Sequence, residues 1–168
     1  MSIKKYFSLL IILASIFLAA CALATSPVVT PQGMPDIGIP LEQLNNDIGL
    51  SAPQGWNTYK AKDSIYLLMQ PISQQIIIFS VADTRTFLYD NGKWVELKDK
   101  TILEPPDLTF ILDPAQGFGH DGSSAVTVDL PDPNKPALLR IFVIGYVYEN
   151  GAKTDKKVAS YIDVNLTP

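Results

Sequence analysis

Short apolar runs separated by turn residues fill the chain from about residue 64 to its end. Alternating apolar and polar positions are typical of half-buried β-strands, and after residue 55 no sustained 3.6-residue period predicts a helix. In the last run Val158, Ile162 and Leu166 fall on one face, and Tyr161 and Asp163 on the other. The pattern predicts eight strands, over residues 64–70, 75–81, 84–89, 94–98, 107–112, 124–130, 138–148 and 158–166.

One pair of these strands is joined by a strong hairpin signal. Asn91-Gly92 lies between two apolar runs, and a two-residue Asn-Gly loop favours a tight turn because both central residues must adopt positive φ. The resulting register pairs Tyr89 with Trp94, Leu88 with Val95, and Phe87 with Glu96.

About eight strands at spacings of roughly 8–14 residues predict an all-β fold, an antiparallel sandwich in a domain covering residues 55–168. A closed barrel is the competing architecture.

The amino terminus has a different pattern. Lys4 and Lys5 precede fifteen residues, Tyr6 to Ala20, that are interrupted only by Ser8 and Ser15. As a helix this segment would be about 22 Å long, which is short for a hydrocarbon core of roughly 30 Å. It therefore fits a signal peptide over residues 1–20 better than a permanent membrane span.

Leu18-Ala19-Ala20-Cys21 follows this apolar segment and resembles the lipobox of bacterial lipoproteins. The resemblance implies a diacylglyceryl group on the Cys21 sulfur and cleavage before Cys21, so that the chain is anchored on the extracytoplasmic side of a membrane, in the cell envelope. Palmitate-like acyl chains would hold it there, because each buried methylene contributes about 0.8 kcal/mol. The alternative is a core cysteine behind a buried helix. In the lipoprotein family Ala22, rather than an aspartate, favours the outer membrane where the host has one.

Residues 21–54 are rich in proline, including Pro27, Pro31 and Pro35, and are expected to form a tether behind the lipidated cysteine. If extended, residues 22–40 would span roughly 60 Å. Leu41, Leu44 and Ile48 have helical spacing, which leaves room for one short helical turn that Gly49 would end.

Charge and composition exclude several classes of function. The first twenty residues hold two lysines and no acid, so removing them changes the net charge from −4 to −6. This charge argues against a nucleic-acid binder. With one cysteine and one histidine, the chain cannot form an internal disulfide or a His-rich metal site. No cofactor is expected.

A looser similarity extends over residues 60–166, which resemble the immunoglobulin-like domains of bacterial surface proteins without the paired cysteines of antibody domains. It implies a sandwich and says nothing about the ligand. The motifs that carry it are, in chain order, Ser64-Ile65-Tyr66-Leu67, Asn91-Gly92-Lys93-Trp94, Leu112-Asp113-Pro114, Val126-Thr127-Val128-Asp129-Leu130 and Leu139-Arg140-Ile141.

Catalytic chemistry has weak support. His120, the only imidazole, lies beside Asp121 in a glycine-rich loop, whereas catalytic triads usually draw on separate elements. Asp113, Asp121, Asp129 and Asp132 are acids in turns, and their spacing does not match a calcium loop. A hydrolase accessory or weak enzyme using Asp113, His120 and Asp121 is the alternative function.

Aromatic residues are the better candidates for binding. Trp56, Tyr59, Tyr89 and Trp94 could present rings to a glycan or a protein, although Trp94 could instead fill the core. Arg140 lies in an apolar strand and is expected to pair with Asp163 or Asp129 rather than with a ligand.

These features predict a lipid-anchored β-domain that is not an enzyme and that binds or scaffolds a protein or glycan of the envelope. Its other partner is the membrane, through Cys21. A module that is stable only within a larger envelope complex is a further interpretation.

Overall fold

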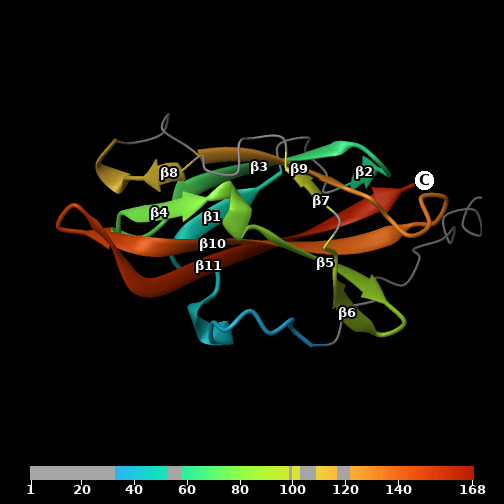
Figure 1. Cartoon of the computed structure of the whole chain (residues 1–168), viewed down its shortest axis with the longest axis horizontal. Coiled ribbons are helices and arrows are strands. Elements are labelled where there is room, and N and C mark those ends of the chain that lie inside the picture. The colour runs from blue at the N-terminus through green and yellow to red at the C-terminus, as the bar shows by residue number, and fades with distance from the viewer. Residues whose placement is uncertain (1–32, 53–57, 99, 103–108, 117–121) are drawn as a thin grey trace, which may run out of the picture. The chain divides into compact units, whose positions relative to one another are not determined.

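The protein is built mainly from β-strands in two sheets. The computed structural model (Figure 1) describes residues 33–52, 58–98, 100–102, 109–116 and 122–168. Within these ranges there are eleven strands and three short 3₁₀ turns, and no α-helix. The turns are η1 (Leu41–Gln43), η2 (Val81–Asp83) and η3 (Pro114–Gln116).

The smaller sheet has four strands in the order β1-β3-β9-β7, and all its pairs are antiparallel. Burial alternates along β3, where Ile65, Leu67 and Met69 are buried and Tyr66 and Leu68 are exposed. The strands are β1 (Ile48–Ser51), β3 (Ser64–Pro71), β9 (Gly122–Val128) and β7 (Lys100–Ile102).

The larger sheet has seven strands, and its centre is a long hairpin of β10 (Ala137–Glu149) and β11 (Ala152–Thr167). β11 pairs in parallel with β2 (Thr58–Lys60), so this sheet is mixed rather than purely antiparallel. The other edge of β10 is shared by β5 (Arg85–Asp90) near its start and β4 (Ile77–Ser80) near its end. Outside these lie β6 (Lys93–Glu96), paired with β5, and β8 (Thr109–Leu112), paired with β4.

The main core lies between the two sheets. Leu139, Ile141 and Val143 of β10 face it together with Val164 and Leu166 of β11. Residues with the opposite parity, including Phe142 and Ala159, belong to a second cluster. The hairpin is thus buried on both faces, which explains why β10 is almost continuously apolar. The alternation predicted for the last strand is confirmed.

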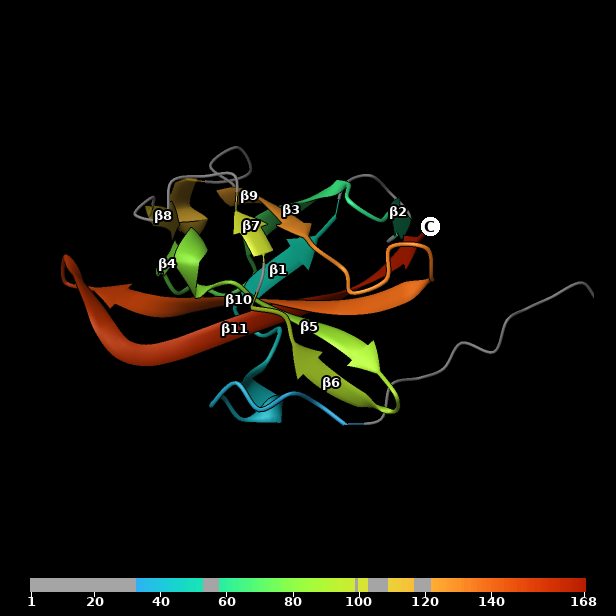
Figure 2. The ribbon, with the colours of Figure 1, turned by 45° about the vertical axis from the view of Figure 1, so that its right-hand side comes forward.

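Residues 33–47, here called the N-terminal strap, cover that second face. Ile37 and Leu44 are buried there against Phe87 and Phe142. Figure 2 shows the strap on the opposite side of β10 and β11 from the four-stranded sheet. Leu44 also forms an isolated parallel bridge with Ala159. Three layers result: the small sheet, the large sheet and the strap.

The folded domain begins earlier in the chain than the boundary at residue 55 that the sequence predicts. Residues 33–52, assigned from sequence to the tether, form the strap and β1, and residues 31–168 form one compact unit. The folded unit therefore begins well before residue 55, because buried Ile37, Leu44 and Ile48 contribute to its cores. Residues 22–32 lie outside the described residues.

Both long hairpins close through Asn-Gly turns. Asn91 and Gly92 have φ of 48° and 84°, and the predicted pairing of Tyr89 with Trp94, Leu88 with Val95, and Phe87 with Glu96 is confirmed. Asn150 and Gly151, with φ of 52° and 79°, join β10 to β11 in the same way. This second turn was not predicted.

The predicted strands are confirmed in outline. All eight predicted strands are present with shifted ends. The chain adds three short strands, β1, β2 and β7. The expected helical turn is the three-residue η1, and it ends before Ile48, which opens β1. Lys153, Lys156 and Lys157 lie on the exposed part of β11.

Candidate binding site at the β5–β6 hairpin

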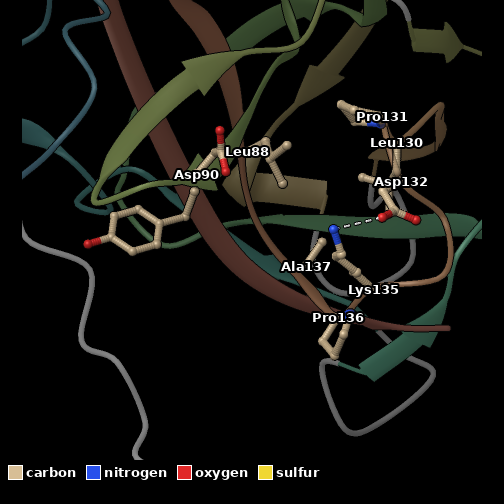
Figure 3. A pocket seen from close by; sticks show the side chains of 9 residues that line it. Leu88, Asp90, Leu130, Pro131, Asp132, Lys135, Pro136 and Ala137 are labelled. Atoms are coloured by element: carbon tan, nitrogen blue, oxygen red, sulfur yellow. Dashed lines mark ion pairs between the residues drawn. The ribbon is translucent and has the colours of Figure 1, made fainter.

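A hollow of about 210 Å³ lies where the end of β5 meets the connection between β9 and β10. It is lined by residues 88–90 from β5, and by residues 130–132 and 135–137 from the connection and the start of β10. Figure 3 shows these two segments facing each other, with Lys135 extended toward Asp132. The backbone pairing of Leu139 with Leu88 fixes the β5 side of the hollow on β10.

An exposed ion pair lies on the connection side of this hollow. Nζ of Lys135 lies 3.0 Å from Oδ2 of Asp132, and the backbone N–H of Asn134 donates to Oδ1 of Asp132 at 3.1 Å. The hydrogen bond from Lys135, and then the one from Asn134, lower the pKa of Asp132 below its ordinary value. The hollow therefore combines an exposed ion pair at its rim with apolar walls from Leu88, Leu130 and Ala137.

Tyr89 connects this hollow to a stack of aromatic and charged groups. Its ring lies 5.1 Å from that of Trp94, measured between centroids, and Trp94 Nε1 donates to the carbonyl of Gly33 in the strap at 3.2 Å. The guanidinium carbon of Arg140 lies 4.4 Å from the Trp94 ring centroid and 4.6 Å from that of Tyr161. A cation held between two rings is a favourable arrangement.

Arg140 is paired with Asp163, as predicted. Nε and Nη2 of Arg140 donate to the two carboxylate oxygens of Asp163 at 2.6 and 2.7 Å. Asp129, the other acid considered, makes no ion pair among the described residues. Because Arg140 is 5% exposed and its charge is satisfied, its role is to hold layers together rather than to capture a ligand.

The predicted ring residues have different positions. Tyr59 is 3% exposed and belongs to the main core, so the expectation that it presents a ring to a ligand is wrong. Tyr89 and Trp94 are brought together and are both half-buried. Trp94 packs against the second cluster rather than standing free. Trp56 and Cys21 lie outside the described residues.

The residues of the alternative enzymatic hypothesis are only partly described. The Asp113 carboxylate accepts from the backbone N–H of Ala115 at 2.9 Å and from Nε2 of Gln116 at 3.3 Å, which supports the turn η3. His120 and Asp121 lie outside the described residues. In the part of the chain that is described, no three His, Cys, Asp or Glu residues are grouped as metal ligands.

The connection over residues 130–137 was not predicted to line a site. Pro131-Asp132-Pro133 marks a turn in sequence, but a turn signal does not show which strand the turn will face. The contact of Arg140 with Trp94 and Tyr161 was also missed, because it joins three strands and the strap.

No protein-family model matches the chain, and no curated protein matches it. Within the described ranges, no helix is long and apolar enough to cross a bilayer.

Proposed function

We propose that the protein is a lipid-anchored module of the bacterial cell envelope that binds an envelope protein or glycan and performs no catalysis. The lipobox-like Leu18-Ala19-Ala20-Cys21 supports the anchor. The hollow beside Tyr89 supports binding, and it is the observation on which the proposed binding function rests. It combines apolar walls, an ion pair at the rim and a half-buried ring, groups that recognition sites use.

The strap sets how far the folded unit can lie from such an anchor. The carbonyl of Gly33 is hydrogen-bonded to Trp94, so a lipid on Cys21 would be joined to this fixed point by the chain between Cys21 and Gly33. Twelve residue steps span at most about 40 Å even when fully extended. This reach is shorter than the roughly 60 Å expected from a tether that continues to residue 40, because residues 33–40 belong to the strap.

We further propose that the two-sheet body is a member of the immunoglobulin-like sandwich class. Two sheets that enclose a common core, with the last two strands adjacent in the larger sheet, support this class. The parallel pairing of β2 with β11 is a local departure from a purely antiparallel pattern.

The anchor is tested by substituting Cys21 in the native host. The wild-type chain should incorporate labelled palmitate and lose residues 1–20, as read by mass spectrometry. Cys21→Ala should remain uncut and unlabelled. A wild-type chain with an intact Met1 and a free thiol would refute the anchor.

The binding function is tested at the rim of the hollow. Immobilised wild-type protein should retain an envelope protein or glycan from solubilised envelopes, and Lys135→Ala should weaken that retention by about tenfold. Lys93→Ala is the matched control, since Lys93 is exposed on the same hairpin end and does not line the hollow. Equal retention by all three proteins would show that the hollow is not the binding site.

A further inference from the structure

The strap buries few of its own side chains against the larger sheet. Of its fifteen residues only Ile37 and Leu44 are buried, each 8% exposed, and nine are exposed. Both buried residues belong to the second cluster, which is separate from the main core. A segment with so little buried surface is expected to detach at a low free-energy cost while the main core stays closed.

The face of the large sheet beneath the strap is rich in aromatic rings (Figure 2). Phe142 lies at its centre, 5.6 Å from Phe87 and 5.5 Å from Tyr161 between ring centroids. Trp94 packs against the same cluster. We call these four residues the strap face. Aromatic surfaces of this kind bind proline-containing peptide segments.

Two of the contacts that hold the strap use its backbone rather than its side chains. Nε1 of Trp94 donates to the carbonyl of Gly33 at 3.2 Å, and Nη1 of Arg85 donates to the carbonyl of Asp36 at 3.5 Å. Every peptide carries carbonyl groups that can accept in this way. Neither contact is therefore specific to the sequence of the strap.

The strap also shows what kind of peptide fits this face. Pro35 and Pro40 flank the buried Ile37, and Pro40 has φ −57° and ψ 142°, which is the polyproline conformation. Residues 33–40 belong to no helix or strand. An apolar side chain between two prolines, together with backbone carbonyls, therefore seats this part of the strap without a β-ladder.

The cations at this face are already neutralised. Arg140 is paired with Asp163, and Arg85 with Glu96. An acidic segment would gain no unpaired cation here, whereas an apolar segment would gain contact with the rings. The chemistry of the face thus matches an apolar peptide, as the strap is at Ile37.

We propose that the strap face is a docking site for a proline-containing apolar segment of a partner protein, and that the strap fills this site in the free protein. The strap face adjoins the hollow, because Tyr89 lines the hollow and its ring lies 5.1 Å from that of Trp94. A protein bound at the hollow can therefore place a segment on the strap face. The inference rests on the proposed function and narrows its partner to a protein.

The test measures binding of a fluorescently labelled peptide with the sequence of residues 33–46 to the full-length protein in detergent. In the wild type the attached strap competes with this peptide. Ile37→Asp weakens the attached strap and leaves the strap face unchanged, so this variant should bind the peptide at least about tenfold more tightly than the wild type. Asn45→Ala loosens the strap at its other end and should bind the peptide several-fold more tightly, which decides the test if Ile37→Asp does not fold. Absence of peptide binding by a folded variant of either kind would overturn the proposal.

Altered peptides test the stated chemistry of the partner segment. A peptide with Ile37→Asp should bind at least about tenfold more weakly, because it would bury a charge. A peptide with both Pro35→Gly and Pro40→Gly should bind several-fold more weakly, because the free peptide has more conformational freedom to lose. Equal binding of a peptide with the same composition in reversed order would show that the face is adhesive rather than selective, and the proposal would be rejected.

Variants of the body locate the peptide and separate the two proposals. Combined with Ile37→Asp, Trp94→Phe removes the indole donor and keeps an aromatic ring, so it should weaken peptide binding several-fold; unchanged affinity would place the peptide elsewhere. Lys135→Ala in the same background should leave the peptide affinity unchanged, because Lys135 lines the hollow. Peptide binding without retention of an envelope partner would therefore refute the hollow alone, and retention without peptide binding would refute the strap face alone.

Size-exclusion chromatography distinguishes a partner protein from a second copy of this chain. The wild type should elute as a monomer with its own strap in place. A wild-type dimer that Ile37→Asp dissociates would show that the strap of a second copy fills the face, and the assignment to a partner protein would be wrong.

Discussion

Arg140 donates hydrogen bonds to both carboxylate oxygens of Asp163 on the neighbouring strand, at 2.6 and 2.7 Å. The two residues are direct partners in the β10–β11 register. Because the same guanidinium contacts the rings of Trp94 and Tyr161 and donates to the sulfur of Met34 at 3.1 Å, it joins the central hairpin to β6 and the strap. A single buried cation thus connects two of the three layers.

Asp163→Ala should destabilise the protein strongly. It removes two charge-assisted hydrogen bonds and leaves the buried charge of Arg140 without its counterion, so the free energy of unfolding should fall by about 2–3 kcal/mol. The change is measured by urea unfolding followed through tryptophan fluorescence.

Glu96→Ala is the matched control for that experiment. Arg85 also binds both carboxylate oxygens of its partner, at 2.8 Å each, and the hydrogen bond to Glu96 raises the pKa of Arg85. The two side chains are 32% and 36% exposed, so solvent screens the pair and the loss should be less than about 1 kcal/mol. Equal losses in the two variants would show that the burial of Arg140 is not decisive.

Asn45 is expected to control whether the strap stays attached. Its Oδ1 accepts from the hydroxyl of Ser160 and the backbone N–H of Tyr161, both at 2.8 Å. Asn45→Ala leaves the buried hydroxyl of Ser160 without this partner and places alanine at a φ of 60°. We expect a loss of about 1–2 kcal/mol, together with faster proteolysis within residues 33–47.

Asn45→Asp provides the control for the strap. Aspartate keeps an oxygen acceptor at the same place and also tolerates the left-handed region, so the proteolysis rate should stay near that of the wild type. Proteolysis that is unchanged in Asn45→Ala would show that the packing of Ile37 and Leu44 is sufficient to hold the strap.

The two Asn-Gly turns allow a test of backbone strain alone. A Cβ at Gly92 or Gly151 would have no atom within 4 Å other than those of its own residue and its two chain neighbours, so a side chain there is limited mainly by backbone conformation. A valine must still adopt a φ of 84° or 79°, and each variant should lose about 1–3 kcal/mol in thermal or urea unfolding. Replacement by asparagine should cost less, because asparagine enters the left-handed region more easily. Equal costs for valine and asparagine would contradict a strain mechanism.

The sequence was most informative where local chemistry decides the structure. The apolar runs predicted eight of the eleven described strands, and Asn91-Gly92 predicted one register residue by residue. The same signal at Asn150-Gly151 was overlooked, because the polar residues after it suggested a connection. Strands β1, β2 and β7 were missed, because their positions are defined by pairing with β3, β11 and β9 rather than by a local alternation.

The site was less predictable than the fold. The pairing of Arg140 with Asp163 could be predicted, because a cation in an apolar strand needs a neighbouring carboxylate to neutralise it. The burial of Tyr59 could not be inferred, since it depends on the parallel pairing of β2 with the end of β11. The hollow also depends on which connections face each other, and residue spacing alone does not determine this.

Acid should weaken the ion pair at the rim of the hollow beside Tyr89. Because hydrogen bonds from Lys135 and Asn134 lower the pKa of Asp132 in the folded protein, the stabilisation they provide is complete above the ordinary aspartate pKa of about 3.9 and is lost as the pH falls through the lowered value. Carbon NMR of the side-chain carboxyl should show Asp132 titrating below that ordinary value. Lys135→Ala should move the midpoint upward, whereas Lys93→Ala should leave it in place. An Asp132 that titrates at its ordinary value in the wild type would mean that Lys135 does not hold it in solution.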